Sequence, residues 1–545
     1  MLHLAFLIIT NNTKITIILA NVSLFILGLV NYVVSGIRGT PIVPWDFLAT
    51  RTALSIASYH TIEFDPYIFL AGFSLVILVA IALKLRHTIK MTLVNVALRF
   101  VCLLVIVTLS ASFYMTDMIN IFGLQTNLWR PTVEFANNGF LASFVKQSRN
   151  LFNRRPDVYC LDTIREAAER YTVLCDWEDI PITDRPNVIV IMNESFSDLT
   201  VNRYFSTSEC FMPFFRSLAY EPNVIMGNAH ASIFGSPTPN SEWEFLTNNS
   251  MAFMPHRSVP YQQFIRRQSP SIAWIMSDIG YDVSAIHTWY GPGYRRTSVY
   301  PLIGFERFYF LEDLRDNLCW VRMYPSDIST YREIIRIFEE KEPDERIFNF
   351  TITMQNHSGF DVADFESTIF LDSIDAPRVE QYLSLIRIAD DSLEYLIEYF
   401  SNVEEDTIIL FFGDHQPPHL EPSFWDYLLP DGIDVNSRFV VPFMIWANYD
   451  IEVPEVSDIS LNYLSVLLMD VAGLPTTPYM NFLRSLQHTI PVITGNGFIE
   501  HTGQQHTLGD HTDYYELLKL YQMIQYNNVF DFNNRVNNFF SLTRR

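Results

Sequence analysis

Arg185-Pro-Asn-Val-Ile-Val-Ile-Met-Asn-Glu-Ser-Phe-Ser-Asp198 is the stretch of sequence that decides the fold. Its centre is a short run of apolar, mostly β-branched residues, with Pro186 before it and polar residues after it. Such a run is typical of a strand that is buried on both faces of a parallel sheet. In open α/β sheets, ligands bind just beyond the carboxyl ends of the strands. Glu194 therefore stands where a catalytic or metal-binding carboxylate is expected.

A second stretch, Thr407-Ile-Ile-Leu-Phe-Phe-Gly-Asp-His-Gln-Pro417, repeats this pattern. A short apolar strand ends at a glycine, and Asp414 and His415 follow directly. Two predicted strands thus deliver Glu194, Asp414 and His415 to one edge of a sheet. A mixture of carboxylate and imidazole ligands suits Mn, Zn or Fe, whereas sites made only of oxygen suit Mg or Ca.

Between Pro186 and about residue 480, strand-like runs alternate with amphipathic helical patterns. This order predicts an α/β sheet that is covered by helices on both sides. Asp390 and Asp391 fall within a helical pattern, and we expect them on a solvated face rather than as ligands. The strands are expected at residues 187–192, 283–287, 347–353, 407–412 and 439–446, and the helices include 261–279, 329–340 and 379–400.

The first 115 residues indicate a membrane-embedded region. The chain has 545 residues, 49% of them hydrophobic, and a mean hydropathy of +0.12. Residues 15–34, 67–83 and 91–114 are each near the ~20 apolar residues that cross ~30 Å of hydrocarbon. Residues 1–9 are apolar but too short to span, and they lack the features of a removable signal peptide. They are expected to be the end of a cut-off span or an interfacial stub.

Basic residues predict the orientation. Lys84, Arg86 and Lys90 crowd the link between the second and third spans, so this link should be cytoplasmic and everything after the third span extracellular. Residues 116–545 hold 30 basic and 57 acidic residues, a net charge of −27, which argues against nucleic-acid binding. The predicted domains are a transmembrane region (1–115), an interfacial connector (116–184), a catalytic domain (185–480) and a C-terminal extension packed on it (481–545).

A third motif is Gly235-Ser-Pro-Thr-Pro-Asn-Ser-Glu-Trp-Glu-Phe245. Thr238 followed by Pro239 is typical of a helix N-cap with proline at the first helical position. The Thr238 hydroxyl would then lie at the positive end of a helix, where a phosphate or a developing alkoxide is stabilised. Glu242 and Glu244 are expected only to support this helix start.

As a set, these motifs resemble the lipoteichoic acid synthase and phosphoglycerol transferase group of the sulfatase/alkaline-phosphatase superfamily. The resemblance covers most of the chain, including a membrane region followed by an extracellular domain. The residues that carry it are Asn193-Glu194-Ser195, Thr238 within its Ser-Pro-Thr-Pro motif, Thr353-Met-Gln-Asn-His357 and Gly413-Asp-His415.

The resemblance implies roles for particular residues. Thr238 would be the nucleophile, and one divalent metal ion, usually Mn²⁺ with Mg²⁺ or Zn²⁺ as alternatives, would be held by Glu194, Thr238, Asp414 and His415. The substrate phosphate or glycerol would be contacted by His287, Arg296 and His357. A hydroxyl needs a metal to become a nucleophile near neutral pH, and an arginine can bind a phosphate through two hydrogen bonds.

The function expected from this set is transfer of glycerol phosphate from phosphatidylglycerol, through a phospho-threonine ester, to a polymer or glycolipid acceptor. The protein would be a multi-pass protein of the cell membrane that works on membrane lipid. Two alternatives stay open: a phosphoethanolamine transferase of the same superfamily, and a catalytically silent binding protein. Sulfate-ester hydrolysis is disfavoured, because Ser236 has neither a proline two residues later nor an arginine four residues later, as formylglycine formation requires.

Overall fold

A computed structural model of the chain describes residues 2–38, 41–49, 65–85, 92–115, 123, 131–148, 153, 155–174, 180–255, 258–430, 435–454, 456 and 458–543. The chain divides into two compact units, Met1–Phe152 and Asn153–Arg545. The domain boundaries that we predicted after residues 115, 184 and 480 stay predictions.

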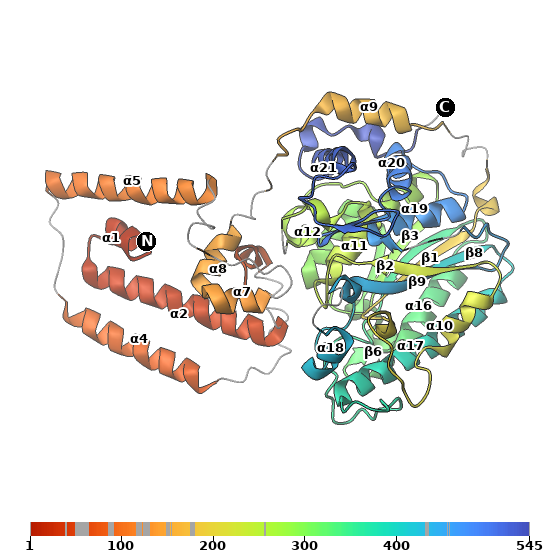
Figure 1. Cartoon of the computed structure of the whole chain (residues 1–545), viewed down its shortest axis with the longest axis horizontal. Coiled ribbons are helices and arrows are strands. Elements are labelled where there is room, and N and C mark those ends of the chain that lie inside the picture. The colour runs from red at the N-terminus through yellow and green to blue at the C-terminus, as the bar shows by residue number, and fades with distance from the viewer. Residues whose placement is uncertain are drawn as a thin grey trace. The chain divides into compact units, whose positions relative to one another are not determined.

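The first unit is helical, and three of its helices are long and apolar enough to cross a membrane. They are α2 (Thr13–Arg38), α4 (Pro66–Lys84) and α5 (Leu93–Met115), and shorter helices are α1 (Leu2–Thr10), α7 (Pro131–Asn138) and α8 (Phe140–Gln147) (Figure 1). Their apolar side chains point outward; Phe69 is 68% and Leu93 91% exposed. Exposure of this kind fits a lipid environment and confirms the three predicted spans.

The chain is therefore a multi-pass membrane protein, and by the positive-inside rule its second unit lies on the outer side. Lys84 ends α4, whereas Arg86 and Lys90 lie outside the described residues.

Cysteine labelling on intact cells checks this orientation. The native cysteines are first replaced, since Cys160, Cys210 and Cys319 are free and exposed. A membrane-impermeant maleimide should then label Tyr220→Cys, because Tyr220 is 91% exposed in the second unit. It should label His87→Cys only after the cells are permeabilised. Labelling of position 87 alone on intact cells would reverse the orientation.

An eight-stranded mixed sheet forms the centre of the second unit, in the order β10-β2-β9-β8-β1-β7-β3-β4 (Figure 1). Strands β8, β1, β7, β3 and β4 are parallel, and β9 runs antiparallel to both its neighbours. The five predicted strands are confirmed to within one residue at each end. The strands are β1 (Asn187–Asn193), β2 (Val224–His230), β3 (Asp282–His287), β4 (Arg307–Phe310), β7 (Ile347–Ile352), β8 (Thr407–Gly413), β9 (Val440–Ala447) and β10 (Ile459–Ser460).

Helices cover both faces of this sheet, as predicted. Strand β1 is wholly buried; Val188 and Val190 enter one hydrophobic core, and Ile189 and Ile191 enter the other. The first core is closed by α9 (Leu161–Tyr171), α11 (Thr238–Thr247), α13 (Ile272–Asp278), α19 (Leu461–Val471), α20 (Pro478–Gln487) and α21 (Tyr515–Val529). The second is closed by α10 (Pro213–Ser217), α16 (Asp327–Glu340), α17 (Pro377–Ser401) and α18 (Pro422–Leu428).

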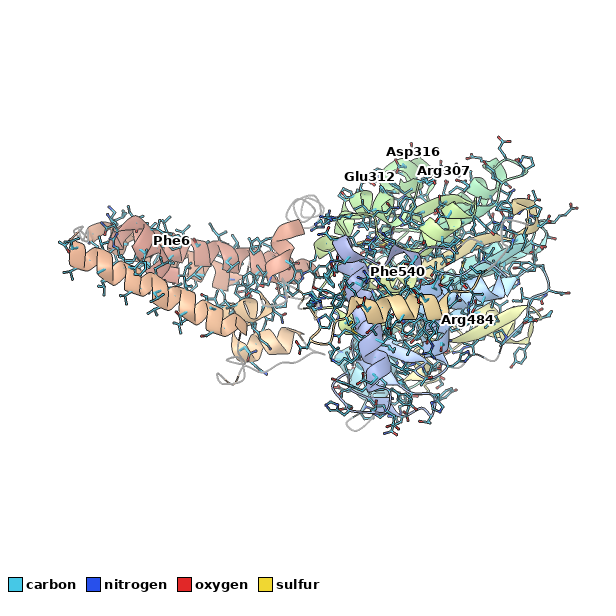
Figure 2. All side chains as sticks on the ribbon, turned by 90° about the horizontal axis from the view of Figure 1, so that it is seen from above. Phe6, Arg307, Glu312, Asp316, Arg484 and Phe540 are labelled. Carbon is cyan, nitrogen blue, oxygen red and sulfur yellow. The ribbon has the colours of Figure 1, made fainter. Side chains whose placement is uncertain are left out.

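The C-terminal residues belong to the first core. Phe540, labelled in Figure 2, packs edge-on against Tyr479, with ring centroids 5.1 Å apart. The hydroxyls of Tyr479 and Tyr521 each donate to the Asn248 carbonyl at the end of α11, at 2.8 Å. A small sheet of β11 (Val492–Thr494), β12 (Gly497–Ile499) and β13 (Gln505–His506) completes this region. Helix α11 is thus held from the far end of the chain.

The single helix predicted for residues 261–279 is wrong. Two helices occur there, α12 (Pro260–Gln263) and α13, which begins only after Ser271. Pro270 disfavours helical geometry in the residue before it. The Ser271 hydroxyl then accepts a hydrogen bond from the Trp274 N–H at 3.2 Å and caps a new helix.

The predicted solvated position of Asp390 is also wrong. Asp390 is fully buried, and its two carboxylate oxygens accept hydrogen bonds from the N–H groups of Phe214 and Phe215, each at 2.8 Å. It therefore caps helix α10 from a distant helix. Asp391 is half-exposed and pairs with Arg387.

We expect Asp390→Ala to lower the free energy of unfolding by roughly 1–3 kcal/mol, since it leaves two buried N–H groups unpaired. Asp391→Ala is the matched control, because a surface ion pair contributes only about 0–1 kcal/mol. Denaturant unfolding of the two variants measures both values, and equal losses would contradict the capping role.

Candidate functional site

Four parallel strands end side by side at one edge of the sheet. In the register of β8, β1, β7 and β3, Gly413 lies beside Asn193, Met192 beside Ile352, and Ile352 beside His287. The segments that follow these ends therefore leave the sheet together. They carry most of the residues that the sequence singled out.

Glu194, Asp414 and His415 form one buried cluster. A ligand atom from each lies within 4.8 Å of the others. The His415 Nε2 atom is 3.2 Å from an Asp414 carboxylate oxygen and 3.9 Å from a Glu194 carboxylate oxygen. All three side chains are nearly inaccessible to solvent.

The main chain fixes the spacing of this cluster. The Ser195 N–H donates to Asp414 Oδ1 at 2.8 Å, from a backbone with φ of 53°. A Cβ atom at Gly413 would come within 2.0 Å of the Phe196 carbonyl oxygen, so only glycine fits at the end of β8. The turns after β1 and β8 therefore touch backbone to backbone, which holds Glu194 close to Asp414.

The chemistry of the cluster fits a cation. His415 Nδ1 lies 3.1 Å from the Gln416 carbonyl, which can only accept, so Nδ1 carries the proton and Nε2 presents a lone pair to the carboxylates. The buried Asp414 Oδ2 has no hydrogen-bond donor among the described residues. The lone pairs of Asp414 Oδ2 and His415 Nε2 face each other at 3.2 Å in a buried place, and this arrangement suits a positive charge between them.

The electrostatics agree with this interpretation. Burial raises the pKa of Asp414 to about 7. Burial, and next the neighbouring Asp414, raise the pKa of Glu194, while burial lowers the pKa of His415. Each group is thus shifted toward its neutral form. A bound divalent cation would lower the pKa values of both carboxyl groups and stabilise their ionised forms.

Thr238 lies against the same cluster. Its hydroxyl donates to Glu194 Oε2 at 3.5 Å. The predicted N-cap role is wrong: Pro237 is the N-cap, and Thr238 is the first residue of α11 with no capping hydrogen bond from a side chain. The hydroxyl instead faces the carboxylates. Thr238 thus lies beside Glu194, and its predicted roles as nucleophile and metal ligand stay predictions.

Of the three predicted substrate-binding residues, His357 interacts with Glu194 and His415 of this cluster, whereas His287 interacts with His357 and Arg296. The pKa of His287 is lowered mainly by burial, next by the positive charge of Arg296, and less by His357. The Nδ1 atom of His287 is buried and has no hydrogen-bond partner among the described residues. His357 Nδ1 is 2.9 Å from the Tyr324 hydroxyl, and its ring interacts with Glu194. The roles of His287, Arg296 and His357 in substrate binding stay predictions.

Sequence reasoning missed the partner of Arg296. The Arg296 guanidinium pairs with Glu242, which is fully buried on α11. Glu242 and Glu244 had been expected only to support the start of α11, and that expectation is wrong: Glu242 binds Arg296, and Glu244 binds groups in the segments before and after the helix. Glu244 accepts from the Ser232 hydroxyl at 2.8 Å and from the Met251 N–H at 2.7 Å.

Comparisons with known proteins bear on this site. A family model described as Sulfatase matches residues 186–474, which include every candidate site residue. A putative cyclic β-1,2-glucan modification protein of Rhizobium meliloti (strain 1021) is 30% identical over 65% of this chain and 56% of its own length. A lipoteichoic acid synthase of Staphylococcus saprophyticus subsp. saprophyticus is 25% identical over 42% of this chain and 36% of its own.

Among solved structures, a phosphoglycerol transferase GacH of Streptococcus pyogenes, in complex with sn-glycerol-1-phosphate, has a similar fold. It matches with a TM-score of 0.58 and 20% identity, over 72% of this chain and 99% of that one. The chain spans about half or less of the curated relatives that it matches. These matches confirm the predicted superfamily and the sulfatase-like α/β fold.

Proposed function

Because this chain belongs to the sulfatase family, whose model matches more than half of it, we propose that it is a membrane-anchored, metal-dependent transferase of a phosphate ester. In this proposal it moves glycerol phosphate from phosphatidylglycerol to a polymer or glycolipid of the cell envelope. The observation that carries the proposal is the Thr238 hydroxyl facing a buried cluster of two carboxylates and an imidazole lone pair. The names of the Staphylococcus and Streptococcus matches support the glycerol phosphate group.

Glu194, Thr238, Asp414 and His415 would hold one divalent ion, proposed to be Mn²⁺ with Mg²⁺ or Zn²⁺ as alternatives. When bound, such an ion lowers the pKa of a hydroxyl and neutralises phosphoryl oxygens.

The Thr238 oxygen attacks the phosphorus of the donor, and its proton passes to the carboxylate side of the cluster. The bond from phosphorus to the diacylglycerol oxygen breaks, and diacylglycerol leaves after taking up a proton. An acceptor hydroxyl then attacks the phospho-threonine ester and restores the free Thr238 hydroxyl. His287, Arg296 and His357 bind the phosphate or glycerol during both steps.

Two other functions stay as alternatives. A phosphoethanolamine transferase would use the same residues with another headgroup. A silent binding protein would have no use for a hydroxyl placed at 3.5 Å from a metal-ligand carboxylate. The name of the Rhizobium relative adds one acceptor to test, a cyclic β-1,2-glucan.

The test uses the purified full-length protein in detergent with Mn²⁺. Phosphatidylglycerol labelled in its headgroup should yield diacylglycerol and a labelled acceptor, with glycolipid and cyclic β-1,2-glucan supplied in separate reactions. Headgroup-labelled phosphatidylethanolamine is the parallel donor. Turnover of phosphatidylethanolamine alone would favour the phosphoethanolamine alternative, and turnover of neither donor would favour a binding protein.

A further inference from the structure

Glu242 makes a contact that the mechanism above does not use. It lies on α11, one helical turn after Thr238, so both side chains lie on the same side of the helix. Its carboxylate is fully buried; its two oxygens share the single N–H of Arg296 Nε, at 3.0 and 3.3 Å, and one of them also accepts from Arg296 Nη2. The Tyr300 hydroxyl donates to the same carboxylate at 3.3 Å.

This arrangement restricts Arg296 strongly. Two nitrogens on one edge of the planar guanidinium are bound by Glu242, so the plane and the direction of the group are set. The contacts of the described residues leave Nη1 without a hydrogen-bond partner. Both N–H groups of Nη1 and the second N–H of Nη2 therefore remain to donate to a ligand.

Arg296 also lies near His287, the last residue of β3. Burial, and next the positive charge of Arg296, lower the pKa of His287. Glu242 and Thr238 belong to one helix. Because Glu242 binds Arg296, the position of the Arg296 guanidinium is fixed relative to the Thr238 hydroxyl.

We propose that Glu242 is a positioning residue that holds Arg296 in the direction needed to bind the phosphate group of the substrate above Thr238. This inference rests on the proposed phosphate-transfer function. A structural ion pair would also be buried and bidentate, but it would affect only the stability of the fold. The two roles differ in what happens to phosphate binding when Glu242 is changed.

Glu242→Gln keeps the shape of the side chain and removes its charge. An amide offers one acceptor oxygen to Arg296 and turns an N–H group toward it, so the guanidinium should rotate away. Glu244→Gln is the matched control, because Glu244 is equally buried on the same helix but binds only hydroxyls and a backbone N–H.

Calorimetric titration of the Mn²⁺-loaded full-length protein with sn-glycerol phosphate, and separately with inorganic phosphate, gives the decisive values. Glu242→Gln should weaken both affinities by about tenfold or more, as changes in the residues that orient ligands do. KM for the lipid should rise more than kcat falls, and Glu244→Gln should leave both affinities near the parental ones. In an Arg296→Gln background, Glu242→Gln should have no further effect on the affinities.

Unchanged phosphate affinity in folded Glu242→Gln, even with a lower melting temperature, would overturn the positioning role. Tighter phosphate binding would also overturn it, since Glu242 would then compete with phosphate for Arg296. If the parent fails to turn over any lipid donor but binds inorganic phosphate more tightly than Glu242→Gln does, the proposed transferase function fails while the positioning role stands.

Discussion

Thr238→Val should abolish the release of diacylglycerol from phosphatidylglycerol. Valine keeps the β-branched shape of threonine and removes only the oxygen that would attack phosphorus. A nucleophile has no substitute in a double-displacement reaction, so the rate should fall by about 10⁴-fold or more. Thr238→Ala should have the same effect.

Folding should survive this change. Pro237, not Thr238, is the N-cap of α11, and the Thr238 hydroxyl makes no capping bond whose loss would destabilise the helix. Mass spectrometry of the parent after brief exposure to donor should find a glycerophosphoryl group on the peptide that contains Thr238. If Thr238→Val has a normal melting temperature and still turns over lipid at a near-parental rate, the covalent mechanism is ruled out.

Asp414→Ala should strip the metal from the protein. Elemental analysis should find about one divalent ion per parent chain and almost none in the variant, and lipid turnover should be lost with it. The metal binds only the folded state, so Mn²⁺ should raise the melting temperature of the parent and not that of the variant.

Asp390→Asn is the matched control, because Asp390 is a buried carboxylate of the same unit that binds backbone N–H groups away from the cluster.

Low pH should weaken metal binding, as the Asp414→Ala mutation does. The metal-free Asp414 has a pKa of about 7, so protons compete with the ion as the pH falls through this value. Metal affinity should be weaker at pH 5 than at pH 8, and equal metal content in parent and Asp414→Ala would contradict the assignment.

The sheet centre could be predicted from the sequence because its strands are buried on both faces. Residues 187–193 and 407–413 are nearly continuous apolar runs, and each stops at the polar residues of the site. Strand β2 escaped prediction because it mixes Gly227 and Asn228 with apolar residues. Gly227 is required by packing, since a Cβ atom there would come within 2.7 Å of the Phe443 ring.

Long-range pairing limited the prediction of the site. Glu194, Asp414 and His415 could be grouped because strand ends predict a common edge. The pair of Glu242 with Arg296 joins residues 54 positions apart, and Asp390 caps a helix more than 170 positions away. Neither contact produces a pattern in the sequence near Glu242 or Asp390. The burial of these two carboxylates is therefore seen only in the folded chain.

The anchoring of α11 by the C-terminal region has a practical consequence for anyone who wants a water-soluble fragment. Residues 186–474 match the family model, yet Tyr479 and Tyr521, which bind the end of α11, lie beyond them. Gln525 also accepts from the Ser250 N–H at 2.8 Å and donates to the Ser250 carbonyl at 2.9 Å. A fragment cut at residue 474 would expose the apolar surface under α20 and α21 and should aggregate during purification, whereas residues 153–545 keep this support for the helix of Thr238.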